Sequence, residues 1–580
     1  MSNDGAQIED ELRTDAKAYQ DLEYTSNVAG NHQAQTSKTS IAEASPASTT
    51  SSTKEGEIEY VYLTFDTEIA TRPMFLENAV KDYPPCPSLK EYDNPFTWSK
   101  TRKNLMTWVS CATNMTAAYS AGSYAAPEAQ LTELWGVSRV AYNVGITVFT
   151  VGFGIAPMVL APFSEINGRR PVFIATGILF VAMQLACSLT DSYAGMLVSR
   201  LFAGIGGSTF STMVGGILAD IWVSSERNTP MVLFTGATLF GTGLGPLVSG
   251  FVAQRLLWRW VFYLQVMTSG ILVGLVTIFF KETRGPILLS RKAKVLNKWY
   301  DKLEALGAIG MVVPDPSSTQ TFSEKPQDYK PQRIRYKVLA EESRASLLSM
   351  IRLSLTRPAH LLISEPVVIC FSLWISFSWA ILYLQFGAIP LVYSTNHNFT
   401  LEQTGAVFTA VCVGGFLSTV LSIYQDKWAV RRFGERFTRS PEGRLWFTCA
   451  EALLMPVGMF WFGWTCYSSI HWIVPTLGLV AVTMGIFSIF LATFNYTADV
   501  YQTYASSALA ASGVCRNFLG GSFPLVTAQI FQKLGFQAAS SLLGGIGIVL
   551  SLGPILLIWY GPRIRLRSKV ARQFVRKEEV

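Results

Sequence analysis

Long apolar stretches with very few charges alternate with short polar segments along most of this chain. Each stretch is close to the ~20 residues that a helix needs to cross the hydrocarbon core of a bilayer. They fall into two groups of six, which predicts an all-α integral membrane protein of two six-helix bundles and twelve spans. The predicted spans are 105–126, 140–163, 171–190, 196–219, 229–252, 260–280, 362–391, 403–425, 445–466, 472–494, 504–530 and 540–560.

Polar segments flank and separate the two predicted bundles, 101–282 and 359–562. Residues 1–100 are rich in Ser, Thr, Ala, Glu and Gln, and they contain too little apolar surface to offset the loss of chain entropy on folding. We therefore expect a disordered tail there. Residues 283–358 form a predicted linker with an amphipathic basic helix around Arg291 to Leu306, and 563–580 form a basic tail.

The charge pattern fixes the predicted orientation. Only 15% of residues are charged, the net charge is +7, and basic side chains gather at every second interhelical segment. The positive-inside rule then places both termini in the cytoplasm and requires an even number of spans. Because the basic residues lie at span ends, the net charge gives no support for a nucleic-acid partner. Four scattered histidines and eight cysteines, mostly within or beside apolar runs, show no metal-ligand spacing, so we expect no metal site.

The segment between the second and third spans reads Ala161-Pro-Phe-Ser-Glu165-Ile-Asn-Gly168-Arg169-Arg170-Pro171. Gly168 permits a tight reversal, and the acid can sit against a helix N-terminus or an arginine, a contact that a conformational change could break. This segment resembles the signature Gly-x-Leu-x-Asp-x-x-Gly-Arg-Arg/Lys of the major facilitator superfamily. The Ser-Glu and Gly-Arg-Arg-Pro variant is similar to fungal twelve-span drug:proton antiporters, which include polyamine and multidrug exporters. Ala161 and Phe163 depart from the first Gly and Leu of that pattern.

The fourth span contains Arg200-Leu-Phe-Ala-Gly204-Ile-Gly206-Gly207. An arginine within an apolar span is costly and is a functional-site hypothesis by default. The alternative is that Arg200 lies close enough to the outer membrane surface for its guanidinium to reach water. The resemblance implies a role for Arg200 in proton coupling.

The fifth span contains Gly241, Gly245, Pro246 and Gly250. Glycines at four-residue spacing let helices approach closely, and generic helix packing is one explanation for them. The ending Gly-Pro-x-x-Ser-Gly resembles the antiporter motif of the superfamily, which implies export rather than uptake.

A carboxylate in the first span, which several such exporters use for coupling, is missing here, and the polar candidates there include Asn114. Glu451 in the ninth span is the other candidate. It either binds a proton or a cationic substrate, or it pairs with Arg444 or Arg516 near the inner surface. Asp220 and Asp499 lie near the predicted inner face, where we expect them to help close the cytoplasmic side.

The expected substrate cavity is aromatic and amide-rich, with few fixed charges, which suits amphipathic or weakly cationic organic compounds better than sugars. Its candidate lining residues are Asn114, Tyr142, Asn143, Gln265, Trp374, Trp379, Tyr383, Gln385, Phe386 and Asn495.

Taken together, these features predict a proton-coupled exporter of drugs, toxins, secondary metabolites or polyamines, monomeric and surrounded by lipid in the plasma membrane. An uptake symporter or facilitator on the same fold is the alternative, and a non-transporting sensor is a more distant one. No GxxxxGK[ST], HExxH or GxSxG motif occurs, so we expect no enzyme activity, no cofactor and the proton gradient as energy source. The sequon at Asn398 is a candidate glycosylation site.

Overall fold

The computed structural model describes residues 58–75, 83–223, 226–312, 332–342, 346–434 and 441–568. It divides into a helical unit, Ser99–Thr283 with Ser346–Val580, and a smaller unit, Met1–Trp98 with Arg284–Ala345.

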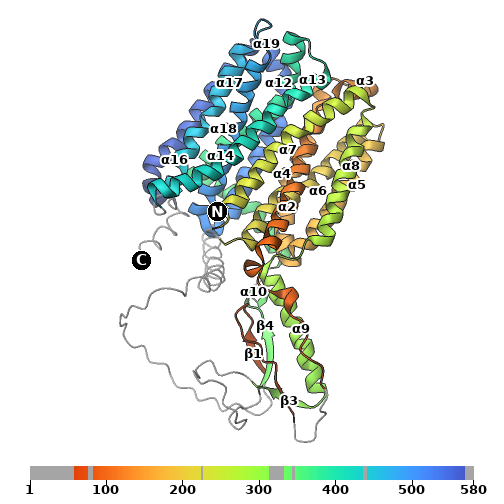
Figure 1. The fold of residues 1–580 in the computed structure, drawn as a ribbon, viewed down its shortest axis with the longest axis vertical. Helices are drawn as coiled ribbons and strands as arrows, with labels where there is room; N and C mark the ends of the chain where they lie inside the picture. The colour runs from red at the N-terminus through yellow and green to blue at the C-terminus, as the bar shows by residue number, and fades with distance from the viewer. Residues whose placement is uncertain are drawn as a thin grey trace, which may run out of the picture. The chain divides into compact units, whose positions relative to one another are not determined.

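The helical unit contains two successive sets of long helices (Figure 1). The first set is α2 (Lys100–Ser123), the short α3 (Glu128–Trp135), α4 (Arg139–Asn167), α5 (Arg169–Leu189), α6 (Tyr193–Ile221), α7 (Asn228–Arg255) and α8 (Arg259–Phe279). The second set is α11 (Leu347–Ser364), α12 (Pro366–His397), α13 (Leu401–Val407), α14 (Thr409–Phe433), α16 (Pro441–Ala452), α17 (Leu454–Thr465), α18 (Ile473–Tyr501), the short η4 (Gln502–Tyr504) and α19 (Ala505–Arg567).

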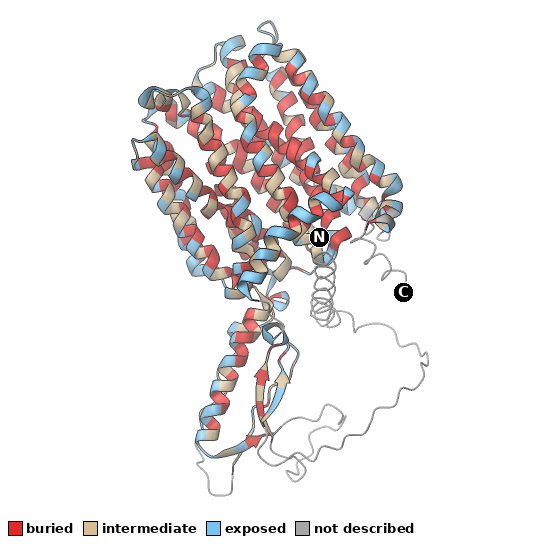
Figure 2. Ribbon diagram, turned by 180° about the vertical axis from the view of Figure 1, so that it is seen from behind, coloured by how far each residue is buried: buried red, intermediate tan, exposed pale blue. Residues whose placement is uncertain are grey.

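Ten helices among the described residues are long and apolar enough to cross a membrane. The outward faces of the unit carry large apolar side chains, such as Ile271, Ile278 and Val549, that are mostly exposed. Buried residues concentrate on the helix faces turned inward (Figure 2). Because such an apolar exterior is unfavourable in water and favourable in lipid, the unit is a multi-pass membrane protein.

The number of crossings stays a prediction. Helix α2 is not among the ten, because many of its inward-facing residues are polar, including Ser110, Asn114 and Ser120. Helix α19 turns within its length at Gly535, whose φ of 77° and ψ of 165° are not helical. The cytoplasmic location of both termini also stays a prediction.

The predicted span 362–391 corresponds to α12, but its first three residues belong to a separate preceding helix. Helix α11 ends at Ser364, Glu365 is extended (φ −111°, ψ 108°), and α12 begins at Pro366. Proline disfavours the helical conformation of the residue before it and fits the first position of a new helix, so the break follows from Pro366 itself.

The smaller unit corrects the expectation of a disordered tail over residues 1–100. Residues 58–75 and 83–98 are ordered here, whereas 1–57 and 76–82 lie outside the described residues. Strand β1 (Ile58–Tyr62) pairs in parallel with β4 (Arg333–Lys337), and β2 (Pro73–Phe75) pairs antiparallel with β3 (Ala308–Met311). Two short 3₁₀ helices, η1 (Lys90–Tyr92) and η2 (Pro95–Thr97), follow β2. The partners lie in the distant linker, which is why local composition did not reveal this unit.

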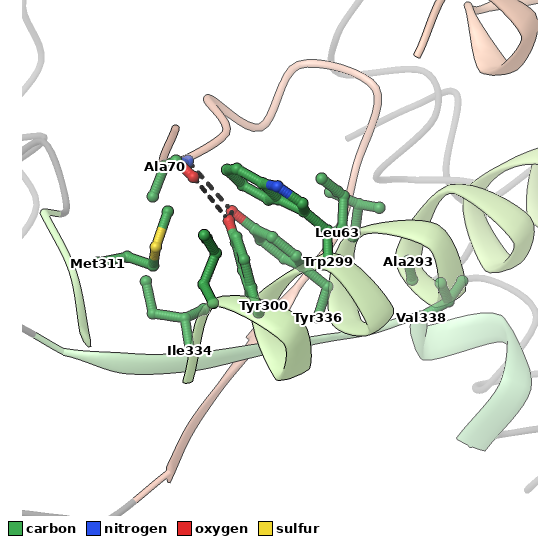
Figure 3. Packing of buried hydrophobic residues seen from close by; sticks show 11 residues of the cluster. Leu63, Ala70, Ala293, Trp299, Tyr300, Met311, Ile334, Tyr336 and Val338 are labelled. Atoms are coloured by element: carbon green, nitrogen blue, oxygen red, sulfur yellow. Dashed lines mark hydrogen bonds between the residues drawn. The ribbon is translucent and has the colours of Figure 1, made fainter. Parts of the chain in front are cut away.

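Helix α9 (Gly285–Ala305), which covers the predicted amphipathic helix, supplies the core of the smaller unit. Its buried residues include Leu296, Tyr300 and Leu303, spaced three or four positions apart so that they share one face. They pack with Ile334 and Tyr336 of β4, whose alternate side chains face the core (Figure 3). The remaining described element of this unit is α10 (Leu339–Glu342).

The N-terminal segment is joined to this core by hydrogen bonds as well as apolar contact. The hydroxyl of Tyr300 donates to the carbonyl oxygen of Ala70 at 2.8 Å, and the Ala70 amide donates to the hydroxyl of Tyr336 at 3.5 Å (Figure 3). Burial raises the pKa of Tyr300, which keeps its hydroxyl protonated and able to donate.

Ion pairs join the end of α9 to strand β4 in this unit. Glu304 pairs with Arg333 at 2.9 Å and with Arg335 at 2.9 Å. Burial raises the pKa of Glu304, but hydrogen bonds from the two arginines outweigh it and lower the pKa to about 2. Because this lies below the ordinary value of 4.5, the contribution of Glu304 to stability is present at neutral pH and is lost as the pH falls from that value through about 2.

We predict that Glu304→Gln loosens the pairing of β1 with β4. The amides of residues 333–337 should exchange hydrogen about fivefold faster in the full-length protein, the effect of losing about 1 kcal/mol. Asp301→Asn is the matched control, because Asp301 contacts only one of the two arginines and is 63% exposed. Equal exchange in the two variants would contradict the bridging role.

Candidate functional site

The turn between α4 and α5 positions a buried ion pair. Gly168 adopts a φ of 99°, a conformation that favours glycine, and thereby places Arg169 at the start of α5. The Nε of Arg169 donates to Oδ2 of Asp220 at 2.5 Å, near the end of α6, and the side chains are only 9% and 12% exposed. Glu165 is half-buried in the last turns of α4.

Glu282, three residues after the end of α8, caps the same turn. Its carboxylate accepts hydrogen bonds from the backbone amides of Arg169 at 2.9 Å and Arg170 at 3.3 Å. A Cβ at Gly168 would lie 2.3 Å from Oε2 of Glu282, so only glycine leaves room for the carboxylate. An acid at a helix N-terminus is stabilised by the helix dipole. The ends of α5, α6 and α8 are therefore held together by charge.

Arg200 lies wholly inside the first set of helices. Its guanidinium lies 4.6 Å from the ring centre of Tyr124 and 4.3 Å from that of Phe149, and it donates to the carbonyl oxygen of Ser120 at 3.1 Å. Since its exposed fraction is 0%, it does not reach the surface of the unit. Tyr142 stacks on Tyr124 with ring centres 4.6 Å apart, so Tyr142 supports this arginine site.

One side of α7 is in backbone contact with α2. A Cβ at Gly241 would lie 2.3 Å from the carbonyl oxygen of Met115, and one at Gly245 would lie 2.5 Å from that of Tyr119. The ring of Pro246 approaches to 2.8 Å of where Gly122 would carry a Cβ. No side chain larger than hydrogen fits at these positions without moving α2.

The other side of α7 is in equally close contact with the second set of helices. A Cβ at Gly243 would lie 2.8 Å from Cβ of Val411 in α14, and one at Gly250 would lie 3.0 Å from Cα of Gly405 in α13. The four motif positions Gly241, Gly245, Pro246 and Gly250 thus serve contacts to both bundles.

Three polar contacts also join the bundles. Arg255, at the end of α7, pairs with Glu402 of α13 at 2.9 Å. The side-chain amide of Asn143 in α4 donates to the carbonyl oxygen of Pro524 in α19 at 3.1 Å, and Thr147 donates to that of Gly521 at 2.7 Å.

A narrow cavity lies between the two bundles and contains about 340 Å³ of space between atoms, parts open to solvent included. Its walls come from α2, α4, α6, α7, α12 and α19. The lining residues are Asn114, Ala117, Ala118, Ala121, Phe149, Phe153, Ser211, Thr238, Thr242, Trp379, Tyr383, Arg516 and Asn517.

Three of the predicted lining residues, Asn114, Trp379 and Tyr383, meet in this cavity. The amide of Asn114 donates to the hydroxyl of Thr238 at 2.6 Å, which fixes the side chain against α7. Phe386 packs beside the cavity, with its ring centre 5.0 Å from that of Tyr383, and the neighbouring Gln385 is buried in α12.

The remaining predicted lining residues lie elsewhere. Gln265 donates to the hydroxyl of Ser123 at 2.9 Å inside the first bundle, and Trp374 donates to that of Ser551 at 3.1 Å inside the second. Tyr142 and Asn143 have the contacts described above, and Asn495 is half-buried on α18. Sequence pattern identifies polar and aromatic residues on a span, but it does not show which neighbour each one faces.

Arg516 is the charged residue of the cavity. Its guanidinium lies 4.7 Å from the ring centre of Trp379 and 5.0 Å from that of Phe490, and the residue is 5% exposed. Within the described part of the chain, no residue forms an ion pair or a hydrogen bond with this guanidinium.

Glu451 is half-buried on α16 and accepts a hydrogen bond from the hydroxyl of Ser488 at 2.7 Å and another from the side chain of Gln425. No described side chain forms an ion pair with it, and the Arg444 side chain lies outside those described. Asp499 is half-buried near the end of α18, and Asn398 is exposed in the short turn between α12 and α13.

Comparison with known proteins decides the family. Residues 108–524 match the sequence profile of the Major Facilitator Superfamily. This chain belongs to that superfamily. It is therefore a membrane transporter rather than an enzyme.

Its relatives include several fungal transporters. The chain is 33% identical to the MFS-type transporter paaT of Penicillium rubens, over 83% of each protein. It is 31% identical to the probable drug/proton antiporter YHK8 of Saccharomyces cerevisiae, over 79% of this chain and 84% of that protein. Among solved structures, the proton:xylose symporter XylE shares the fold, with a TM-score of 0.51, 15% identity, and coverage of 80% of this chain and 96% of that one.

The sequence analysis missed several residues of this transporter that cap the α4–α5 turn or line the cavity. Glu282, Phe149, Phe153 and Asn517 were not singled out, although Glu282 directly follows the sixth span and Asn517 follows an arginine within a span. Glu282 is a charged residue at the end of a predicted span, and Asn517 is a polar residue inside one. A polar residue at such a position is a sign of function that the sequence alone could have provided.

We predict that Asp220→Asn strongly destabilises the transporter, because it leaves Arg169 buried without its partner charge. Breaking a buried ion pair costs about 3 kcal/mol, so thermal unfolding in detergent should begin at a clearly lower temperature. Asp191→Asn is the control, because Asp191 pairs with Arg259 at the surface and should contribute less than about 1 kcal/mol. Similar unfolding of both variants would refute the importance of the buried pair.

We predict that Gly241→Val costs about 1–3 kcal/mol and reduces transport, because its side chain must push α2 away from α7. Gly270→Val in α8 makes the same chemical change where no atom lies within 4 Å of the added Cβ. It should leave the yield and unfolding temperature of purified protein near those of the wild type. Equal losses in both variants would argue against the close approach of α2 and α7.

Proposed function

We propose that this protein exports small organic molecules from the cell in exchange for protons. The observation that carries the proposal is the glycine-proline face of α7, which resembles the antiporter motif and contacts α2 on one side and α13 and α14 on the other. Relatives named as an efflux pump of Gibberella moniliformis and as a multidrug transporter of Aspergillus fumigatus, each 30% identical, support export.

Transport would proceed by alternating access, in which two bundles rock around a central site. The cavity lies between the bundles, and contacts such as Arg255 with Glu402 and Asn143 with Pro524 join them. Opening the cavity on the side where these contacts lie requires that they separate. The Arg169–Asp220 pair and the Glu282 cap hold the first bundle together as a unit while it moves.

Glu451 is our candidate for the group that carries the coupled proton. Its carboxylate is half-buried, has no described ion-pair partner, and accepts hydrogen bonds from Ser488 and Gln425. These neutral partners can accommodate both the charged and the protonated form, since a hydroxyl or an amide can donate or accept. Arg200, buried in the first bundle, would contribute a fixed positive charge to the same cycle.

In this proposal the transporter is a monomer in the plasma membrane, with twelve spans and both termini in the cytoplasm. The basic residues at alternate interhelical segments support this orientation. Uptake on the same fold is the competing function, and the direction of substrate flux separates the two.

We predict that cells lacking their own exporters extrude fluorescent drugs when they express this protein, and that a protonophore abolishes most of the extrusion. Glu451→Gln should lose proton-driven extrusion, because the amide cannot bind the proton. Glu133→Gln, at an exposed position of α3, is the control and should retain it. Net accumulation, or extrusion unaffected by the protonophore, would refute proton-driven export.

A further inference from the structure

The cavity contains a permanent positive charge that no residue in the described part of the chain neutralises. Arg516 is 5% exposed, its Nε has no hydrogen-bond acceptor, and no described residue forms an ion pair with it. Its guanidinium lies close to the rings of Trp379 and Phe490. The rings stabilise the cation through their π-electrons, but they supply no acceptor for the N–H groups at its edge.

A second buried cation lies next to the same cavity. Arg200 lies 4.3 Å from the ring centre of Phe149, and Phe149 lines the cavity. No aspartate or glutamate is among the lining residues. The charge exposed in the cavity wall is therefore the positive charge of Arg516, and the charge of Arg200 lies behind Phe149.

The guanidinium group constrains the chemistry of a partner. It stays protonated under all physiological conditions, so the cavity cannot become neutral by losing a proton. Its planar fork of N–H donors matches the two oxygens of a carboxylate, which it binds through paired hydrogen bonds. Phe149, Phe153 and Trp379 provide flat apolar surface beside it for the rest of a molecule.

We propose that this cavity takes small organic anions, with the carboxylate of the substrate bound by Arg516 and its aromatic or apolar body packed against Phe149, Phe153 and Trp379. This rests on the proposed function, in which the cavity is the transport site. It narrows the substrate class suggested by the sequence, because a weakly cationic compound or a polyamine would meet the positive charge of Arg516 here, with that of Arg200 close behind the wall.

The first test uses wild-type, full-length protein in detergent and three probes with one skeleton: naphthoate, its uncharged methyl ester and naphthylmethylammonium. Displacement of radiolabelled naphthoate measures the affinity of each. A charge-assisted pair of hydrogen bonds predicts that naphthoate binds about tenfold or more tightly than the ester, and the ammonium more weakly still. Equal affinity of acid and ester, preference for the ammonium, or no binding of naphthoate would overturn the proposal.

The second test assigns the charge to its residue. Arg516→Gln should weaken naphthoate about tenfold and leave the ester unchanged, and Arg516→Lys should fall between, because it keeps the charge but loses the fork. Arg259→Gln removes a surface arginine paired with Asp191 and should bind all probes as wild type does. Undiminished naphthoate binding by Arg516→Gln would overturn the assignment.

Efflux of the same probes from cells separates the two proposals. Export of the ester or the ammonium without naphthoate binding would refute the anion site and leave the exporter standing. Naphthoate binding that depends on Arg516, with no export of any probe, would leave the anion site standing and refute the exporter.

Discussion

The close approach of α7 to its neighbours is the contact on which the arrangement of the two bundles depends. Within hydrocarbon, the hydrophobic effect does not draw helices together, so association relies on van der Waals contact and on hydrogen bonds. Glycines at positions 241 and 245 bring α7 to the backbone of α2, and those at 243 and 250 bring it to α14 and α13. Helices α2 and α7 also form part of the cavity wall, to which α7 contributes Thr238 and Thr242.

Buried charges inside the helical unit have two different kinds of neighbour. Arg169 has a carboxylate partner, and the N-terminus of α5 has Glu282. Arg200 and Arg516 instead lie against aromatic rings, one in each bundle. A paired charge holds helix ends together, whereas Arg516, which lies against rings and has no described ion-pair partner, keeps its attraction for an anion. If the substrate is an anion, a cell interior at negative potential favours its exit by about 2.3 kcal/mol per charge for each 100 mV.

The sequence alone supported the all-α membrane fold, because hydropathy is averaged over long segments. Errors of a few residues in the predicted ends of a span do not change that result. The sequence also pointed to the turn at Gly168, to Arg200 and to the α7 glycines. A buried arginine is energetically costly in a span, and glycines allow tight turns and close helix contacts, so these residue types stand out. The sequence analysis failed for residues 58–98, whose partners lie in the linker, and for Gln265 and Asn143, which bond to neighbours on other helices. Contacts between distant segments depend on the rotation of each helix, which a single sequence does not determine.

The parallel pairing of β1 with β4 has a consequence for how the chain is made. Ile58 faces Arg333, so the ribosome must synthesise the entire first bundle before the strand finds its partner. At about 5–20 residues per second, that delay is on the order of a quarter of a minute to a minute. During this time β1 is an unpaired strand, open to chaperones and proteases. The small unit can therefore be completed only after the first half of the transporter has been synthesised.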